Sequence, residues 1–283
     1  MFDTFKNRLE ITGTLTTVTA LRISKGRSTE PIGSDLPVIK DALGRPLIPG
    51  SSFKGALRSR LESFLRGIDP NLAEDPANYT SSTRNNQVKG LKVKYKNDDL
   101  NLTQELLDLT DDIGSLFGTP WIASKFQVRD LTVQPDAWFG QYQERDGVAI
   151  DRDTETAADG KLYDYQVVPA ATPFDFKAVV ENAQDWELGL LMIGLHQFET
   201  EQIPLRGGRS RGLGVVKLEI DKMRWIDVED HPEFLLEYLK KLVMGDETAY
   251  EDAADYKDEW VQKLIDRLTR KETKLSETQT QAQ

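Results

Sequence analysis

Basic and small polar residues gather at the start of a predicted helix in the first quarter of the chain. Lys54 and Arg58 stand four residues apart and follow Ser51 and Ser52 in the segment PGSSFKGALR. Free backbone N–H groups and the helix dipole favour an anion at such a position. The spacing therefore permits a phosphate-binding site, and it also permits a capped amphipathic helix with a solvated basic face. The segment does not match the GxxxxGK[ST] pattern of a P-loop.

Asp35 is the conspicuous acid of the polar loop that precedes this helix, and Lys25 and Arg27 make the same loop basic. A carboxylate can hold a hard cation or orient a hydroxyl group, but a lone carboxylate is a poor cage for a metal ion. From the residues alone, Asp35 is most simply interpreted as an ordinary loop acid.

Hydrophobic periodicity predicts the elements that must position these residues. Phe53, Leu57, Leu61, Phe64 and Leu65 recur at helical spacing, so we expect a helix with one buried face. A second helix is predicted over 186–198, and strands are predicted over 8–23 with a break near 13, 36–39, 125–135 with a kink at 129–130, and 215–220. The order strand, helix, strands, helix, strand predicts an α+β fold with a ferredoxin-like core.

Two long excursions interrupt this predicted core. Residues 69–99 are polar, and we expect an irregular surface segment with one hairpin strand over 89–96, followed by a short helix over 103–113. Residues 144–175 are charged in the middle and strand-like at both ends, so we expect a long protruding hairpin. The acids at its centre do not match the spacing of a calcium-binding loop and predict an exposed, charged tip: Asp151, Asp153, Glu155 and Asp159.

Charge is distributed unevenly along the chain, whose formal net charge is −11. Residues 1–66 carry 11 Lys and Arg against 6 Asp and Glu, whereas residues 225–283 carry 8 against 15. A basic leading part can hold RNA on one face while the acidic parts face solvent or partner subunits. We expect residues 1–224 to form the core with its hairpin, and residues 225–283 to form a separate acidic tail with helices over 232–244 and 249–270 and a disordered end.

Other compositional features exclude several classes of protein. The chain has no cysteine, so it has no disulfide or thiolate metal site, and we expect a cytoplasmic location. Its two histidines, His196 and His231, lie far apart in the sequence, which argues against a zinc site. The sequence shows neither a signal peptide nor an apolar run of the ~20 residues that span a bilayer, so we expect no membrane partner.

Several motifs occur in the order that is typical of one family. They are DLPVIKD (35–41), RPLIPGSSFKGALR (45–58), LFGTPW (116–121), VRDLTV (128–133), the excursion at 144–175 and GGRSRGLGVVKLE (207–219). Over residues 8–221 the chain resembles the RAMP superfamily, and more narrowly the repeated backbone subunit of type III CRISPR effector complexes. The resemblance implies an RRM-like core, a protruding thumb at 144–175 and a glycine-rich loop. Three features depart from the family pattern: the 69–99 insertion, Arg22 where many relatives carry histidine, and the acidic tail.

The resemblance also implies an activity. Asp35 would be the catalytic acid of a metal-dependent endonuclease that cuts target RNA with the help of the neighbouring 2′-hydroxyl. The cofactor would be a divalent metal, Mg or Mn, held by Asp35 together with RNA phosphates. The partners would be a crRNA guide, the target RNA, sister RAMP subunits and other CRISPR effector subunits in antiviral defence.

Two sets of RNA contacts follow from the same resemblance. The guide phosphates would be bound by Ser51, Ser52, Lys54, Arg58, Lys25, Arg27, Arg206, Arg209 and Arg211. A wedge into the guide–target duplex would come from thumb residues near Ile150, Tyr163 or Tyr165. The alternatives are a non-catalytic scaffold of the same complex and a guide-processing endoribonuclease, although His196 and His231 are badly placed for the latter. For the glycine-rich loop, the alternative is a plain hairpin connection.

Overall fold

The computed structural model describes residues 3–24, 26, 34–150, 157–205, 207–229, 231 and 233–281. Side chains are described for all of these except 148–150, 157–162 and 272–281. Lys25, Arg27 and Arg206, which the sequence assigns to RNA binding, lie outside the described residues, as does the side chain of Ile150.

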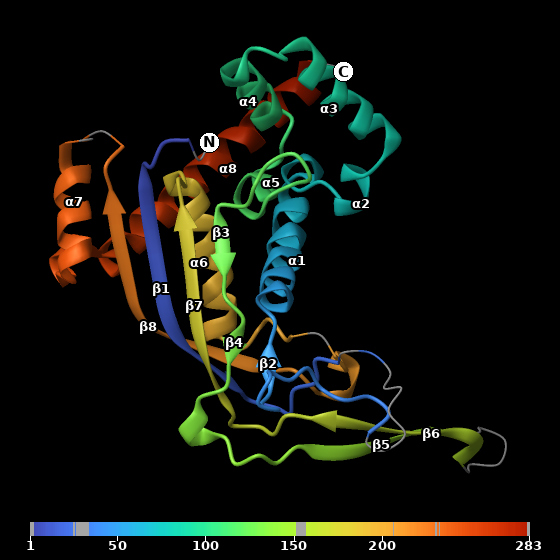
Figure 1. The fold of residues 1–283 in the computed structure, drawn as a ribbon. Coiled ribbons are helices and arrows are strands. Elements are labelled where there is room, and N and C mark those ends of the chain that lie inside the picture. Colours follow the sequence, from blue (N-terminus) through green and yellow to red (C-terminus); the bar gives the residue numbers. More distant parts are fainter. Residues whose placement is uncertain are drawn as a thin grey trace.

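An antiparallel sheet forms the centre of the protein (Figure 1). Within the described residues its strands are, in spatial order, β3 (Phe126–Val128), β7 (Pro173–Glu181), β1 (Asn7–Thr17), β8 (Val216–Asp227) and β9 (Glu251–Asp252). Alternate residues of β1 point into the core, where Leu9, Ile11 and Leu15 are fully buried. The β1–β8 register shifts between Thr12 and Gly13, at the break that the sequence predicts.

Two helices cover one face of this sheet, side by side. The helix α1 (Gly50–Ile68) connects β1 to β3, and α6 (Asp185–Glu199) connects β7 to β8. Phe53 of α1 anchors the contact, because its ring lies 4.3 Å from the ring of Phe198 on α6 and 5.0 Å from that of Phe176 on β7. The two helices predicted from hydrophobic periodicity are therefore confirmed.

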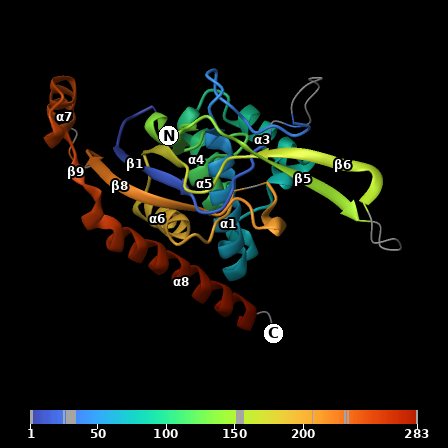
Figure 2. The same ribbon diagram turned by 90° about the horizontal axis from the view of Figure 1, so that it is seen from below.

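The thumb is a hairpin of β5 (Gln143–Ile150) and β6 (Ala157–Val167). It projects from one end of the sheet, on the side away from α7 (Figures 1 and 2). The short strands β2 (Leu47–Ile48) and β4 (Leu131–Thr132) pair close to its base. The predicted hairpin is confirmed, although its last strand-like stretch belongs to the central sheet as β7.

The insertion after α1 is helical, and the predicted strand over 89–96 is wrong. The insertion contains α2 (Pro76–Tyr79) and α3 (Ser82–Lys94), and α4 (Asp99–Asp108) and α5 (Asp112–Phe117) follow it. The alternation of Leu91, Val93 and Tyr95 imitates a strand, but α3 buries Val88 in a small cluster with Leu106. A side chain before each helix accepts a hydrogen bond from its first turn and fixes where it starts: Asp75, Ser81, Asp98 and Asp111.

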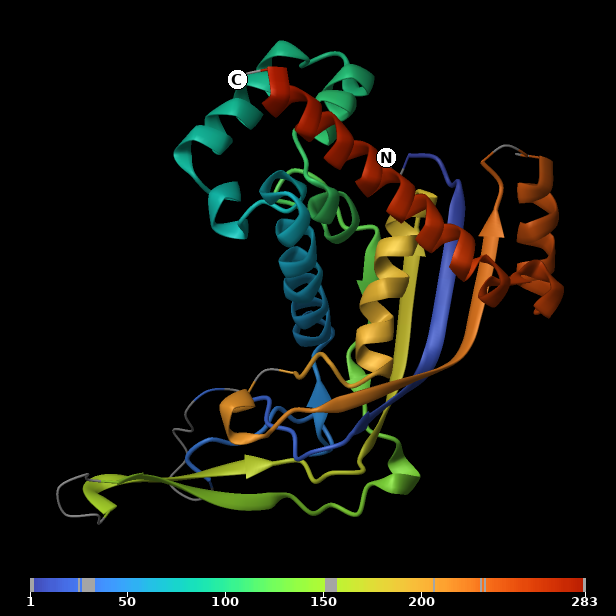
Figure 3. The ribbon, with the colours of Figure 1, turned by 180° about the vertical axis from the view of Figure 1, so that it is seen from behind.

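Residues 225–283 are not a separate tail in this structure. The strand β8 crosses the predicted boundary, and α7 (Glu233–Met244) and α8 (Lys257–Gln281) follow it. Figure 3 shows α8 lying across α6, where Trp260, Leu264 and Leu268 join the main hydrophobic core. A Cβ on Gly189 would lie 2.1 Å from the Trp260 carbonyl oxygen, so only glycine permits this approach. The helix α8 continues to Gln281, and the disordered end stays a prediction.

The described helices do not resemble membrane spans. None of them combines the length and the apolar character that crossing a bilayer requires. α8 is long enough, but it carries many charged residues, beginning with Lys257, Asp258 and Glu259.

Candidate functional site

Asp35 lies where the thumb joins the core, beside the strand β6. Its N–H donates a hydrogen bond to Oδ1 of Asp164 at 3.3 Å, and the next residue, Leu36, forms a parallel bridge with Tyr165. The N–H of Gln166 also donates to the Leu36 carbonyl at 3.1 Å. Asp35 is half-buried, and in the described part of the chain its carboxylate has no hydrogen-bond or ion-pair partner. A carboxylate is thus held in place by its backbone and left available for a ligand.

Asp164 is a second carboxylate at this junction, and sequence reasoning missed it. The two aspartates are 129 residues apart in the chain and meet only because β6 returns past the loop that carries Asp35. No cluster of three or more His, Cys, Asp or Glu side chains suited to a metal occurs among the described residues. Two carboxylates completed by phosphate oxygens of a ligand are, however, the donor set that Mg²⁺ commonly takes.

Two tyrosines on β6 each contact an arginine from another segment of the chain. The guanidinium of Arg22 lies 4.8 Å from the ring centre of Tyr165, and Arg211 donates a hydrogen bond to the Tyr163 hydroxyl at 2.8 Å. Tyr165 is buried, and a Cβ on Gly147 would lie 2.3 Å from the Tyr163 ring. The predicted wedge residues Tyr163 and Tyr165 therefore sit at the base of the thumb and connect it to the core.

The glycine-rich loop packs its backbone against the segment that follows β1. Gly208 and Gly212 adopt positive φ angles of 94° and 74° around a single turn of 3-10 helix, Arg209–Arg211. A Cβ on Gly207 would lie 1.7 Å from the Arg22 carbonyl oxygen. The loop is therefore more than a hairpin connection, because it fixes the backbone that carries Arg22.

The start of α1 differs from the prediction. Pro49 is the N-cap residue, so Ser51 and Ser52 lie inside the first turn and neither of them caps the helix. The N–H of Gly50 donates to Oδ1 of Asp130 at 2.8 Å. The Asp130 carboxylate, from the turn between β3 and β4, thus already accepts one of the N–H groups that the predicted phosphate-binding site would use.

Lys54 and Arg58 are directed inward. The Lys54 ammonium donates to Oγ of Ser124 at 2.6 Å and to the Phe126 carbonyl at 3.0 Å. Arg58 pairs with Glu62 at 2.8 Å. These contacts favour a structural role for both residues, and their predicted contact with RNA stays a prediction.

Burial and then the nearby Arg58 guanidinium lower the pKa of Lys54 from 10.5 to about 8. We expect NMR of reductively ¹³C-methylated protein to show one lysine with a midpoint near pH 8, and the variant Lys54→Met to lack that resonance. The folded protein holds this proton less tightly than the unfolded chain, so stability should rise with pH between about 8 and 10.5. A Lys54 midpoint near 10.5 would contradict the buried geometry.

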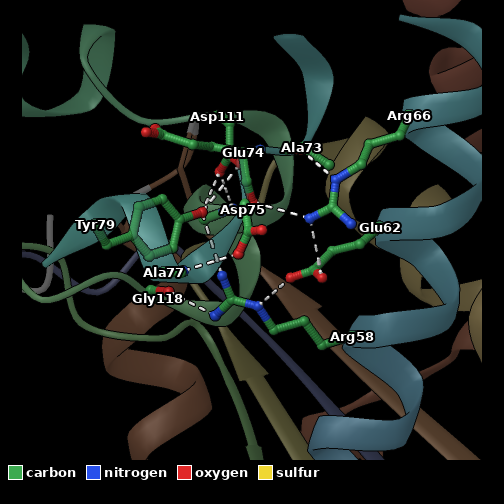
Figure 4. Close-up of polar contacts among 11 residues, drawn as sticks. Arg58, Glu62, Arg66, Ala73, Glu74, Asp75, Ala77, Tyr79, Asp111 and Gly118 are labelled. Carbon is green, nitrogen blue, oxygen red and sulfur yellow. Dashed lines mark hydrogen bonds and ion pairs between the residues drawn. The ribbon is translucent and has the colours of Figure 1, made fainter. Parts of the chain in front are cut away.

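The insertion is tied to α1 by a network of polar contacts that Figure 4 shows. Arg58 and Arg66 both pair with Glu62, and Arg66 also donates to the Ala73 carbonyl at 2.7 Å. Asp111 accepts hydrogen bonds from the Tyr79 hydroxyl at 3.0 Å and from backbone N–H groups. Two arginines of the predicted basic face of α1, Arg58 and Arg66, therefore form contacts within the protein that connect α1 to the insertion.

Arg209 faces α1 instead of lying alone in its loop. A pocket of about 230 Å³ between α1 and the segment after α6 is lined by Ser59, Arg60, Ser63 and Arg209, among others. Arg60 contacts Gln197 through long hydrogen bonds of 3.3–3.4 Å and packs over Phe64. This pocket brings together two cations and two hydroxyl groups, which are ordinary donors to a phosphate.

The chain is similar to known proteins over most of its length. A family model described as the RAMP superfamily matches residues 14–217. Proteins named "CRISPR system Cms endoribonuclease Csm3" are similar to this chain in three organisms. The one from Methanocaldococcus jannaschii is 28% identical over 78% of this chain and 82% of its own length, and the one from Enterococcus italicus is 24% identical over 77% and 92%. The one from Mycobacterium tuberculosis is 50% identical over 56 residues, which are 19% of this chain and 24% of that protein.

Proposed function

Because this chain belongs to the RAMP superfamily, we propose that it is a backbone subunit of a type III CRISPR effector complex that binds a crRNA guide and cuts the target RNA. The observation that carries the proposal is Asp35 at the junction of thumb and core: its backbone N–H donates to Asp164, and its carboxylate has no partner within the described residues. The names of the similar proteins support an endoribonuclease.

The fold supports the same proposal. Each of α1 and α6 joins two strands that run parallel with one antiparallel strand between them, in the order β3-β7-β1-β8. This strand order supports the ferredoxin-like, RRM-like core that we propose for the chain. The thumb and the glycine-rich loop meet at one end of this core through Tyr163 and Arg211, so a strand of RNA that crosses this end would meet both.

We assign the guide's sugar–phosphate chain to the pocket between α1 and the glycine-rich loop. Arg60 and Arg209 line that pocket, whereas Lys54 and Arg58 are engaged within the protein. Lysine and arginine contacts to phosphates supply affinity that does not depend on base sequence. A guide of any sequence could therefore be held there.

The proposed reaction is a transesterification within the target RNA. The 2′-oxygen attacks the adjacent phosphorus, the bond from phosphorus to the 5′-oxygen breaks, and the products carry a 2′,3′-cyclic phosphate and a 5′-hydroxyl. Asp35 would orient the 2′-hydroxyl and accept its proton, while the leaving oxygen takes a proton from water. A divalent metal ion, Mg or Mn, bound by Asp35, Asp164 and RNA phosphates would stabilise negative charge on the phosphate.

The test is target cleavage by the assembled, guide-loaded complex. We expect cuts in complementary RNA with Mg²⁺ or Mn²⁺, products that end in a cyclic phosphate, and loss of cutting in excess EDTA that returned metal restores. Cleavage that persists undiminished in EDTA would contradict the metal-dependent reaction. A complex that loads the guide, binds the target and never cuts it would instead identify a non-catalytic scaffold. The scaffold is the second candidate function, because the described residues contain no cluster of three or more His, Cys, Asp or Glu side chains suited to a metal.

A further inference from the structure

A groove lies between α7 and the edge of the central sheet. Its volume is about 470 Å³, and residues of α7, β8, β9 and the start of α8 line it. The helix α7 packs on the protein through one buried side chain, Tyr238, whose ring stacks on Phe5 and whose hydroxyl lies 3.0 Å from that of Tyr250. The rings of Trp225 and Trp260 form part of the groove wall. The groove can therefore take up side chains from a partner surface.

Carboxylates outnumber cations around this groove. Five acids and one lysine line it: Asp185, Asp227, Glu237, Glu251, Glu259 and Lys241. Residues 233–259 as a whole carry 9 Asp and Glu against 3 Lys. Partial burial raises the pKa of Asp185 and the nearby Glu259 raises it further, although Lys263 opposes both. The groove is therefore a negatively charged surface with aromatic walls, which favours a cationic partner.

The helix α3 carries the complementary charge. The segment 82–96 has five Lys and Arg and no acid. Lys89, Lys92 and Val93 are all exposed, and their helical spacing places them on one face. Within the described residues, neither of these lysines has an ion-pair partner. This face thus presents two ammonium groups beside an apolar side chain, which matches an acidic groove with aromatic walls.

The groove and α3 lie beyond opposite edges of the sheet. The strand order β3-β7-β1-β8-β9 places the groove at the β9 edge, and α3 lies on the side of β3 and α1 (Figures 1 and 3). A contact between two different surfaces of identical chains leaves one of each surface free, so further copies can add in a row. A contact between two grooves would instead bring acid against acid, which disfavours a closed dimer.

We propose that α3 of a second copy of this chain docks in the acidic groove beside α7, so that copies join head to tail. This inference rests on the proposed function, in which the chain is a repeated backbone subunit, and it names the surfaces that meet. Lys89 and Lys92 enter between the carboxylates, and Val93 contacts the aromatic wall. Neither surface includes Asp35 or the glycine-rich loop, so docking leaves both of these free for RNA.

Charge reversal tests the contact in the full-length chain without RNA. Three double variants, all at surface positions, are compared with wild type: Lys89→Glu with Lys92→Glu on α3, Glu237→Lys with Glu259→Lys in the groove, and the control Lys40→Glu with Lys217→Glu outside both surfaces. Sedimentation velocity of wild type should show oligomers beyond the dimer that grow with protein concentration and weaken between about 0.1 M and about 1 M NaCl.

The variants make this result specific to the two surfaces. The α3 variant and the groove variant should each associate at least about tenfold more weakly than wild type, because like charges then face each other. The control should associate as wild type does. An equimolar mixture of the α3 and groove variants should recover association, since each surface of one variant then meets the opposite charge on the other.

The absence of cysteine from the chain permits a second, geometric measurement. A variant with both Val93→Cys and Phe234→Cys carries one thiol on each surface, because Phe234 lines the groove and is 49% exposed. A bismaleimide should join this variant into a ladder of dimers, trimers and longer chains. Each single variant should stay monomeric, and a mixture of the two single variants should stop at dimers.

The outcomes separate this inference from the function on which it rests. Wild type that stays monomeric in both salts, an α3 variant that associates like wild type, or dimers from Phe234→Cys alone would each overturn the head-to-tail contact. The assays contain no RNA, so a complex that never cuts RNA leaves a ladder intact and contradicts only the cleavage proposal. A complex that cuts RNA while no ladder forms overturns only this inference.

Discussion

Replacing Asp35 with alanine is expected to slow target cleavage by about 10²–10⁴-fold while the complex still assembles on its guide. The backbone of residue 35 contributes the hydrogen bond to Asp164 and the neighbouring bridge to β6, and the substitution keeps both. The side chain has no partner within the described residues, so its removal leaves no buried group unpaired. The effect should therefore appear in the rate of cutting and not in stability.

The control for this prediction is Asp221→Ala, an exposed acid of β8. Cleavage is measured with the complex in excess over labelled target RNA, so that product release does not limit the rate. Asp164→Asn should also slow cutting, and raising the Mg²⁺ or Mn²⁺ concentration should partly restore it. Unchanged cutting at every site in Asp35→Ala would show that Asp35 is not catalytic.

Replacing Glu187 with alanine is expected to destabilise the folded chain by about 3–5 kcal/mol. Glu187 is 1% exposed at its side chain and pairs with Lys125, which is 8% exposed, at 2.5 Å. It also accepts the N–H of Gln184 at 2.8 Å and so closes the first turn of α6. The alanine variant leaves the Lys125 ammonium buried without its partner.

The matched control for Glu187 is Glu219→Ala, which breaks an exposed pair with Lys217 and should change stability by less than about 1 kcal/mol. The free energy of unfolding is measured by urea titration of each purified variant. A double variant, Lys125→Met with Glu187→Leu, should recover much of the loss, because it removes both buried charges together. Equal stability of Glu187→Ala and wild type would be incompatible with a buried Lys125–Glu187 pair.

Hydrophobic periodicity predicted the two central helices because each buries one regular face, and the thumb was predicted from strand-like ends around a charged centre. Phe53 and Leu57 of α1 and the apolar run of α6 face one core, so their spacing carried the information. Periodicity gave a wrong prediction for the insertion, because Leu91, Val93 and Tyr95 alternate as in a strand but belong to α3, a helix with little buried surface. The N-cap residues that fix where these helices start, such as Ser81, are single polar residues that resemble loop residues in the sequence.

The candidate site could be predicted only in part. Asp35 came from its motif, but Asp164 meets it through the pairing of Leu36 with Tyr165 on a strand more than a hundred residues away, which no local pattern records. Lys54 and Arg58 have a helical spacing that is typical of an exposed basic face, but their side chains contact other residues of the protein. The contact of Lys54 with Ser124 joins residues 70 positions apart and appears only in the packed structure, whereas Arg58 and Glu62 pair at a spacing of four within α1.

The missing side chain at Gly189 has a consequence for how the protein is made. It lets α8 settle directly on α6, with the Trp260 carbonyl in the space that a Cβ would fill. Ribosomes add roughly 5–20 residues per second, so α6 emerges several seconds before the segment that covers it. During that interval the nascent chain exposes an apolar strip to chaperones and proteases, and a translation product that stops before α8 keeps that strip exposed.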